Sequence, residues 1–241
     1  MAFPTVQIMD VPFIKATNRA FLEQLQQDIT QKNRRFIVTA NPEIVLYAKD
    51  HPDYLTTIKA ADYITPDGIG IIKASTALKT PLPERVTGYD TMIALLKKAD
   101  QQHLKVYLVG AKPEVMARVV TKIQTTYPGI DLCGYHDGYF KDDTKILADI
   151  KAQQPQLVFA GLGYPKQELW IKENYHLTNG IWMGVGGSFD VLSGLTKRAP
   201  KFWQDLHLEW FYRLLKEPTR FKRMLAIPKF MLLIRQEKSK N

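Results

Sequence analysis

Residues 35–50 read "RFIVTANPEIVLYAKD", a short apolar run that leads directly into a helical pattern. The run 35–40 has almost no polar alternation, which is typical of a strand whose two faces are both covered by helices. Asn41 suits a helix cap and Pro42 suits the first helical turn. A buried strand followed at once by a capped helix is the unit from which parallel sheets are built, so this stretch predicts an α/β fold.

The same unit recurs along the chain. Further strands are predicted at 61–65, 105–110, 131–135, 156–163 and 180–187. Helical patterns separate them, including 112–127 with Pro113 in its first turn and 164–175 directly after Gly163. We therefore expect a mostly parallel sheet flanked by helices.

The composition fits a globular protein with a sizeable core. The chain has 241 residues, of which 45% are hydrophobic, which suits one α/β domain with an appendage. Cys133 is the only cysteine, so we expect no disulfide within the chain and a reducing, cytosolic setting. The N-terminal segment lacks the basic region of a signal peptide, and no window reaches the roughly 20 apolar residues of a membrane span. We expect the chain to be neither exported nor integral to a membrane.

The positive charge is concentrated at the C-terminal end. The formal net charge is +9, and the residues from Thr196 to Asn241 hold 12 Lys and Arg against 4 Asp and Glu, a net of +8. We therefore divide the chain into a near-neutral core, 1–195, and a basic appendage, 196–241. Such a tail is typical of contact with an anionic partner, namely phosphate, nucleic acid or anionic lipid, and the alternative is a solvated basic helix.

The tail has two helical faces. Aromatic and apolar residues recur at Trp203, Leu206, Trp210 and Leu214, and cations recur on another face at Arg213, Lys216, Arg220 and Arg223. Two or three short amphipathic helices of this kind suit a membrane interface. The alternative is that the aromatic stripe simply docks on the core.

Glycines gather where predicted strands end, at Gly110, Gly161, Gly163, Gly184, Gly186 and Gly187. Ligands of open α/β sheets bind outside the carboxyl ends of the strands, so these clusters favour a nucleotide or a sugar phosphate. Neither "GLGYPK" (161–166) nor "GVGGSF" (184–189) has the third glycine of a dinucleotide fingerprint. No GxxxxGK[ST] phosphate loop occurs either. These patterns argue against a nicotinamide dehydrogenase and a phosphate-loop ATPase.

Metal binding has little support in the sequence. The five histidines lie far apart, no DxD motif occurs, and Asp142 and Asp143 lie in a stretch expected to be helical and exposed. We expect neither a metal ion nor another cofactor. Arginines, with their planar forks, would bind a diphosphate instead, and Arg85 and the tail arginines are the available cations.

A carboxylate stands between a proline and a glycine in "ITPDGIG" (64–70). One interpretation is a turn, in which Pro66 presets φ, Asp67 bonds its own backbone and Gly68 supplies a positive φ. The other is an acid or base held on a rigid corner at the end of a buried strand. The local sequence leaves both open.

Six motifs in this order form a more specific pattern: "TANPEIV" (39–45), "ITPDGIG" (64–70), "ERVTGYD" (84–90), "VYLVGAKP" (106–113), "GLGYPKQELW" (161–170) and "GVGGSFDVLSGLTKRAP" (184–200). "EWFYRLLKEPTRFKR" (209–223) follows them. Together they resemble the TagA/WecG/CpsF glycosyltransferase family, and most of all its short Gram-positive TagA type, over about 37–200 and the proximal tail.

The resemblance implies a Rossmann-like core and an inverting transfer of N-acetylmannosamine (ManNAc) from UDP-ManNAc. The acceptor is O4 of N-acetylglucosamine (GlcNAc) in undecaprenyl-diphosphate-GlcNAc, and the product is the β-linked linkage unit of wall teichoic acid. Asp67 is then the candidate base on the acceptor hydroxyl. The implied partners are the UDP-sugar, the lipid-linked acceptor and the inner face of the cell membrane, with no nucleic acid.

The resemblance also assigns roles to other residues. Thr39, Arg85 and Gln167 join Asp67 in the catalytic set, with Arg85 neutralising the diphosphate and Gln167 binding sugar hydroxyls or the acetamido group. The substrate-binding set is Asn41, Gly68, Gly184, Gly186, Gly187, Asp190, Arg213, Arg220 and Arg223. Within it Asn41 is alternatively only a helix cap, Asp190 would bond ribose or uracil, and the three tail arginines would close the pocket over the diphosphate.

Three alternatives remain open. Within the family, a WecG-type enzyme uses N-acetylmannosaminuronic acid (ManNAcA), a donor whose extra carboxylate would need a further cation. In a different class, the basic aromatic tail could make the protein a non-enzymatic nucleic-acid-binding module. A homo-oligomer is also open, because undocking of the tail would expose apolar surface.

Overall fold

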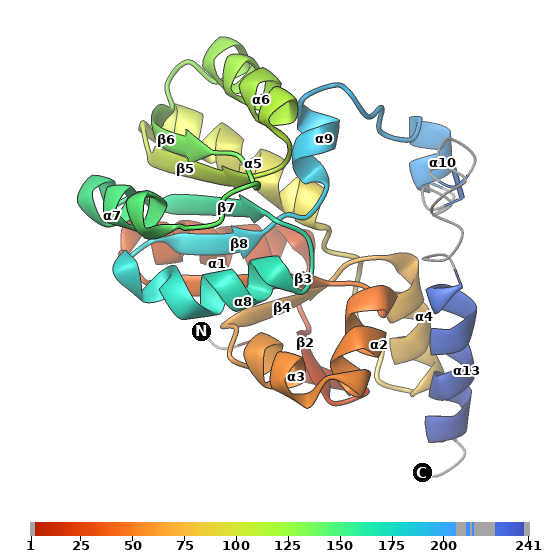
Figure 1. The fold of residues 1–241 in the computed structure, drawn as a ribbon. Helices are drawn as coiled ribbons and strands as arrows, with labels where there is room; N and C mark the ends of the chain where they lie inside the picture. The colour runs from red at the N-terminus through yellow and green to blue at the C-terminus, as the bar shows by residue number, and fades with distance from the viewer. Residues whose placement is uncertain (1–2, 206–210, 213, 215–224, 239–241) are drawn as a thin grey trace.

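The computed structural model describes residues 3–205, 211–212, 214 and 225–238 (Figure 1). The strands are β1 (Thr5–Ile8), β2 (Val11–Ile14), β3 (Arg35–Ala40), β4 (Tyr63–Pro66), β5 (Lys105–Gly110), β6 (Asp131–His136), β7 (Leu157–Gly161) and β8 (Ile181–Gly184). The helices before the tail are α1 (Asn18–Thr30), α2 (Pro42–Asp50), α3 (Pro52–Lys59), α4 (Ile69–Ala77), α5 (Gly88–Gln102), α6 (Pro113–Thr126), α7 (Thr144–Gln153), α8 (Lys166–Asn174) and α9 (Ser188–Leu192), with a 3-10 turn at Tyr175–Leu177. In the tail, the described helices are α10 (Lys201–Asp205) and α13 (Ala226–Lys238).

Six parallel strands form the central sheet, in the order β4-β3-β8-β7-β5-β6. Ala40 at the end of β3 pairs with Pro66 at the end of β4, and Ala160 of β7 pairs with Gly184 at the end of β8. The carboxyl ends of these four strands therefore meet at one edge of the sheet, as parallel pairing requires. The predicted α/β class with a mostly parallel, Rossmann-like sheet is confirmed.

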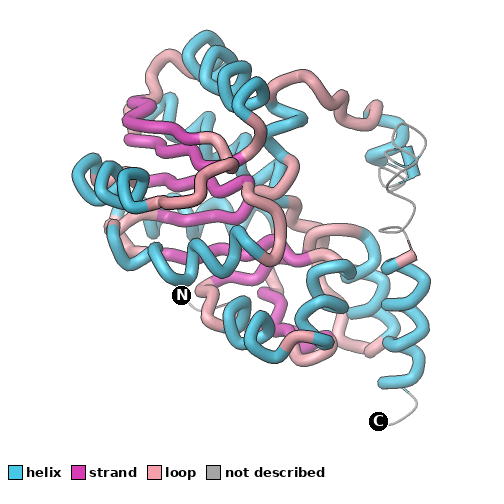
Figure 2. The backbone as a smooth tube through the Cα atoms, in the orientation of Figure 1, coloured by secondary structure: helices cyan, strands magenta, loops and turns pink. Residues whose placement is uncertain are grey.

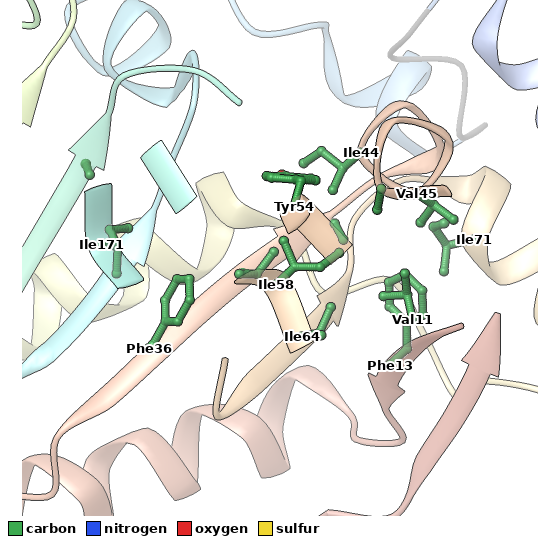
Figure 3. Close-up of a cluster of buried hydrophobic side chains, with 14 of the residues drawn as sticks. Val11, Phe13, Phe36, Ile44, Val45, Tyr54, Ile58, Ile64, Ile71 and Ile171 are labelled. Carbon is green, nitrogen blue, oxygen red and sulfur yellow. The ribbon is translucent and has the colours of Figure 1, made fainter. Parts of the chain in front are cut away.

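Helices cover both faces of the sheet, in a three-layer arrangement (Figure 2). On one face, β3 and β4 pack with α2, α3 and α8, and the close-up shows Phe36, Ile58 and Ile64 meeting there (Figure 3). On the other face, α1, α5, α6 and α9 bury their apolar sides in a second cluster. Because helices cover both faces of the sheet, the strand sequences lack polar alternation.

The turns after β3 and β4 lock against each other. Asn41 caps α2 by accepting the Ile44 N–H at 2.9 Å, and Pro42 follows in the first turn. Gly68 has φ of 95°, and a Cβ on Gly70 would lie 2.6 Å from Pro42 Cγ. Only glycine suits the first conformation, and only a hydrogen leaves room at the second position. The two βα corners thus pack as one unit.

The N-terminal hairpin of β1 and β2 was not expected from the sequence. Its strands pair antiparallel through a two-residue turn, Met9 and Asp10, with φ of 49° and 66°. Turns with two positive φ values are usually signalled by Asn-Gly or Asp-Gly, so this pair gives little local signal.

Other sequence expectations differ in detail. The last strand stops at Gly184 rather than at 187, because the chain turns at Gly186, where φ is 50°. The sequence predicts that Asp142 and Asp143 are helical and exposed, but both residues precede α7, which begins at Thr144. Asp143 is also partly buried, and it accepts the Trp170 indole N–H at 2.7 Å.

The C-terminal helix α13 returns to the core. It packs along α2 and α4 (Figure 1) and buries Phe230 and Ile234 completely in the main hydrophobic cluster. Its opposite side exposes Leu232 and Arg235. Arg213, Arg220 and Arg223 lie outside the described residues. Within the described part of the chain, none of the helices combines the length and apolar character needed to span a bilayer.

Replacing Gly70 by alanine should destabilise the fold. The new methyl group would press on the Pro42 ring, which is held at the start of α2, so one of the two turns must shift. We expect a loss of about 1 to 3 kcal/mol in the free energy of unfolding, measured by urea denaturation. Gly187→Ala is the matched control, because its Cβ would meet only Asp190 Oδ2 at 3.5 Å. Equal stability of the two variants would contradict the packing argument.

Candidate functional site

A pocket of about 370 Å³ opens at the carboxyl ends of β3, β4, β7 and β8. Its volume lies within the range of small-molecule sites. Nine of the residues predicted for the site line it: Thr39, Asn41, Asp67, Gly68, Arg85, Gln167, Gly186, Gly187 and Asp190. Gly184 does not line it but lies directly behind, where a Cβ would be 2.8 Å from Gln167 Nε2. A second hollow, on the exposed side of α6, contains none of these residues.

Asp67 is both a turn residue and a pocket carboxylate. Its backbone N–H donates to the Ala40 carbonyl at 2.9 Å, which ties the end of β4 to the end of β3. Its Oδ2 accepts the backbone N–H of Gly88 at 3.3 Å, in the first turn of α5. A helix N-terminus favours a negative charge, so α5 supports the ionised carboxylate. The corner at "PDG" is thus a turn whose carboxylate lines the pocket, and the role of Asp67 as an acid or base stays a prediction.

Thr39 and Asn41 lie beside Asp67 at the end of the neighbouring strand. Thr39 Oγ1 donates to the Gly184 carbonyl at 3.4 Å, which links β3 to β8. The side-chain oxygen of Asn41 is already engaged as the cap of α2. The capping role of Asn41 is confirmed, and its contact with a sugar stays a prediction.

Gln167 connects the start of α8 to the glycine turn after β8. Its Oε1 accepts the backbone N–H of Gly186 at 3.0 Å, and its Nε2 donates to Glu168 Oε1 at 2.6 Å. Gln167 is buried although it lines the pocket. Its carboxamide is thus fixed from both ends.

Glu168 is a buried carboxyl group that the sequence did not single out. Only 1% of the residue is exposed, and burial raises the pKa of this carboxyl to about 7. Burial and the nearby Glu168 together raise the pKa of the Tyr54 hydroxyl. A hydrogen bond between the Tyr54 hydroxyl and Glu168 adds to the raised pKa of Tyr54 and opposes the rise in the pKa of Glu168. The "PKQE" motif shows that Glu168 follows Gln167 in the sequence. The burial of Glu168 could not be predicted from the motif, because it results from the packing of α8 on segments distant in sequence.

The first turn of α5 also holds the start of the tail. Arg198 makes two bonds to Asp90, at 2.7 and 2.9 Å, and its guanidinium lies 4.8 Å from the centre of the Tyr89 ring. Although partial burial opposes it, hydrogen bonds from Arg198 and from Thr87 keep the pKa of Asp90 below its ordinary value. Arg198 and Tyr89 line the pocket, and no role was predicted for either.

The charges around the pocket are mixed. Among the described lining residues, the carboxylates are Glu43, Asp67 and Asp190, and the cations are Arg85 and Arg198. Ala226 and Ile227 of α13 complete the wall, so part of the tail reaches the pocket. The described Asp, Glu, His and Cys side chains form no group of three or more that could hold a metal ion.

Comparison with known proteins gives one consistent result. The model of the "Glycosyl transferase WecG/TagA/CpsF family" matches residues 6–241. Proteins of Bacillus spizizenii, Bacillus subtilis and Staphylococcus aureus are 42%, 41% and 40% identical to this chain, over 95%, 98% and 98% of its length. The matches cover 90%, 93% and 94% of those proteins, and each is named N-acetylglucosaminyldiphosphoundecaprenol N-acetyl-beta-D-mannosaminyltransferase.

The raised pKa of Glu168 predicts a pH-dependent stability. In the unfolded chain the carboxyl ionises near 4.5, whereas in the folded protein it ionises near 7. Between these values the folded protein keeps a proton that the unfolded chain has released, so the free energy of unfolding falls as pH rises. The full effect is roughly 3 kcal/mol, and it is present above the higher pKa.

Glu168→Gln cannot ionise and should lose this dependence. From about pH 4 to about pH 8, the variant should gain up to roughly 3 kcal/mol in unfolding free energy relative to the wild type, measured by urea denaturation. Glu173→Gln changes an exposed carboxylate of the same helix and should track the wild type. A constant difference between Glu168→Gln and the wild type at both pH values would refute the assignment.

Proposed function

We propose that this chain, which belongs to the WecG/TagA/CpsF glycosyltransferase family, is an N-acetylglucosaminyldiphosphoundecaprenol N-acetyl-β-D-mannosaminyltransferase. It transfers ManNAc from UDP-ManNAc to O4 of GlcNAc in undecaprenyl-diphosphate-GlcNAc, a committed step in making the wall teichoic acid linkage unit. The observation that carries this conclusion is the 40 to 42% identity to transferases of that name over nearly the whole chain. The pocket at the carboxyl edge of the sheet supports it, because that is where α/β enzymes bind nucleotides.

Asp67 is proposed to act as the general base. It accepts the proton of the acceptor O4 hydroxyl while O4 forms a bond to the anomeric carbon of ManNAc. The bond from that carbon to the diphosphate oxygen breaks, and UDP leaves with the electron pair. Attack from the face opposite UDP inverts the anomeric configuration. The hydrogen bond from the Gly88 N–H holds the Asp67 carboxylate in place for this step.

Arg85 is proposed to bind the diphosphate as negative charge grows on the leaving UDP. The tail arginines Arg213, Arg220 and Arg223 would add further donors when the appendage closes over the pocket. Guanidinium groups, rather than a divalent ion, would then balance the charge. The entry of Ala226 and Ile227 into the pocket wall supports a role for the tail here.

The remaining pocket residues are proposed to bind the substrates. Thr39, Asn41 and Gln167 would bond sugar hydroxyls or the acetamido group. Gly68, Gly184, Gly186 and Gly187 would let the backbone approach the substrates closely, and Asp190 would bond the ribose or the uracil.

The charge of the described pocket favours a neutral donor sugar over the uronate ManNAcA. A uronate would bring a further carboxylate into a wall that already holds three. Arg198 is bound to Asp90 through two hydrogen bonds, which neutralises much of its charge. The nucleic-acid-binding alternative leaves the Asp67 corner without a purpose, and the named relatives are enzymes.

We propose that the appendage holds the enzyme on the inner face of the cell membrane. On α13, Pro228, Leu232 and Arg235 are exposed and recur at helical spacing, while Phe230 and Ile234 anchor the helix in the core. An exposed apolar side chain beside a cation suits an anionic lipid surface. Self-association of the chain remains a further proposal.

Asp67→Asn should abolish transfer and leave nucleotide binding nearly intact. The amide oxygen can still accept the Gly88 N–H, but an amide cannot take the proton. We expect kcat to fall by about 100-fold or more, with UDP affinity close to that of the wild type by calorimetry. Asp53→Asn, an exposed change on α3, is the control. Retained turnover would remove Asp67 from the mechanism.

Arg235→Ala should weaken binding to anionic vesicles. One basic residue near such a surface contributes about 1 kcal/mol, so the affinity should fall about fivefold in a flotation assay. Turnover with a water-soluble acceptor should not change. Lys145→Ala on α7 removes an equally exposed cation from another region and serves as the control. Equal vesicle binding by the two variants would place the membrane contact elsewhere.

A further inference from the structure

Glu168 lies one residue from the pocket, yet the proposed mechanism gives it no task. It is 1% exposed and sits on α8, behind Gln167 as viewed from the cavity. Its Oε1 accepts the Gln167 Nε2 donor at 2.6 Å, and its carboxyl group also interacts with the Tyr54 hydroxyl.

Stability does not explain this carboxyl group. Burial of an ionisable side chain costs free energy, and burial raises the pKa of Glu168 although hydrogen bonds with Gln167 and Tyr54 oppose the rise. A group retained against such a cost is a candidate for a functional role.

The hydrogen bonds around Gln167 suggest what that role is. A carboxamide has one acceptor end and one donor end, and the two can exchange by a 180° flip. The Gly186 N–H needs the acceptor end, and the carboxylate of Glu168 needs the donor end. A flipped amide would point its NH₂ group at the Gly186 N–H, so that two donors would face each other. Its oxygen would then face Glu168 Oε1, so that two acceptors would face each other. Glu168 therefore selects one orientation of Gln167.

The glycine turn after β8 depends on that orientation. The backbone at Gly186 has a positive φ of 50°, and apart from its chain neighbours no atom lies within 4 Å of where its Cβ would be. The bond from its N–H to Gln167 Oε1 is a specific anchor. Gly184, at the end of β8, has no room for a side chain because Gln167 fills the space.

We propose that Glu168 is a positioning residue for the transfer reaction: it orients the Gln167 carboxamide and, through it, sets the glycine turn 184–187, of which residues 185–187 line the donor pocket. This inference rests on the proposed function for its kinetic part. The contacts run from Glu168 on α8 through Gln167 to Gly186 in the turn after β8, and the sequence motifs did not predict these contacts. Glu168 itself touches no substrate.

Two substitutions separate the hydrogen bond from the bulk of the side chain. Glu168→Leu keeps the volume and removes the acceptor, so we expect kcat/KM for UDP-ManNAc to fall by about 10- to 100-fold, with a raised donor KM. Glu168→Gln keeps an acceptor oxygen for Gln167, and its new N–H group can donate to the Tyr54 hydroxyl, so activity should be close to wild type. Glu173→Leu, on the exposed side of α8, is the matched control.

A double-mutant cycle tests whether Glu168 acts through Gln167. If it does, adding Glu168→Leu to Gln167→Ala should cause little further loss, because the link is already broken. Additive losses would overturn the proposal, as would full activity of Glu168→Leu or an equal loss in Glu168→Gln.

Nuclear magnetic resonance separates a failure of this inference from a failure of the proposed function. Whether or not transfer is observed, Glu168→Leu should shift the Gly186 amide resonance and speed its hydrogen exchange, and an unchanged resonance would contradict the proposal. If Glu168→Leu does not fold, the wild-type spectrum still tests whether Glu168 orients Gln167. The Gln167 side-chain protons should then exchange slowly and resonate downfield of solvated glutamines, and ordinary values would overturn the proposal.

Discussion

The site depends on how the corner at Asp67 is fixed by two other segments at once, 40–42 and 86–88. Its N–H binds the end of β3 at Ala40, its carboxylate accepts the first turn of α5 at Gly88, and the preceding Pro66 carbonyl accepts the Val86 N–H at 3.0 Å. Pro42, two residues after Ala40, packs against Gly68 and Gly70. A carboxylate held in this way loses little entropy when a substrate binds, which is what a general base requires.

The same first turn of α5 contacts both Asp67 and the appendage. Gly88 bonds Asp67, and two residues later Asp90 binds Arg198 at the start of the tail. A single helical turn thus contacts both the corner and the start of the tail. On the far wall of the pocket, Gln167 and Glu168 hold the glycine turn after β8 by a second set of hydrogen bonds. Asp67 and the glycine turn are thus held by different sets of hydrogen bonds.

Local signals predicted much of this architecture. Unbroken apolar runs predicted the buried parallel strands, and Asn41 with Pro42 predicted the start of α2. Both signals are local, because a strand pattern and a helix cap each depend on residues close together in the sequence. The β1 and β2 hairpin escaped prediction, since Met9 and Asp10 adopt positive φ without glycine. The bond between Asp90 and Arg198 joins residues 108 positions apart, and the burial of Glu168 arises only when α8 packs. Such contacts depend on the tertiary fold and have no local signature.

The central claim is that Asp67 faces the reacting sugars, and a crystal structure with UDP-ManNAc and an acceptor analogue tests it most directly. We expect the donor in the pocket between the ends of β3, β4 and β8. An oxygen of Asp67 should lie about 2.6 to 3.2 Å from the acceptor O4, directly or through one water. A donor bound outside this pocket, or an Asp67 side chain turned away from the acceptor sugar, would contradict the account.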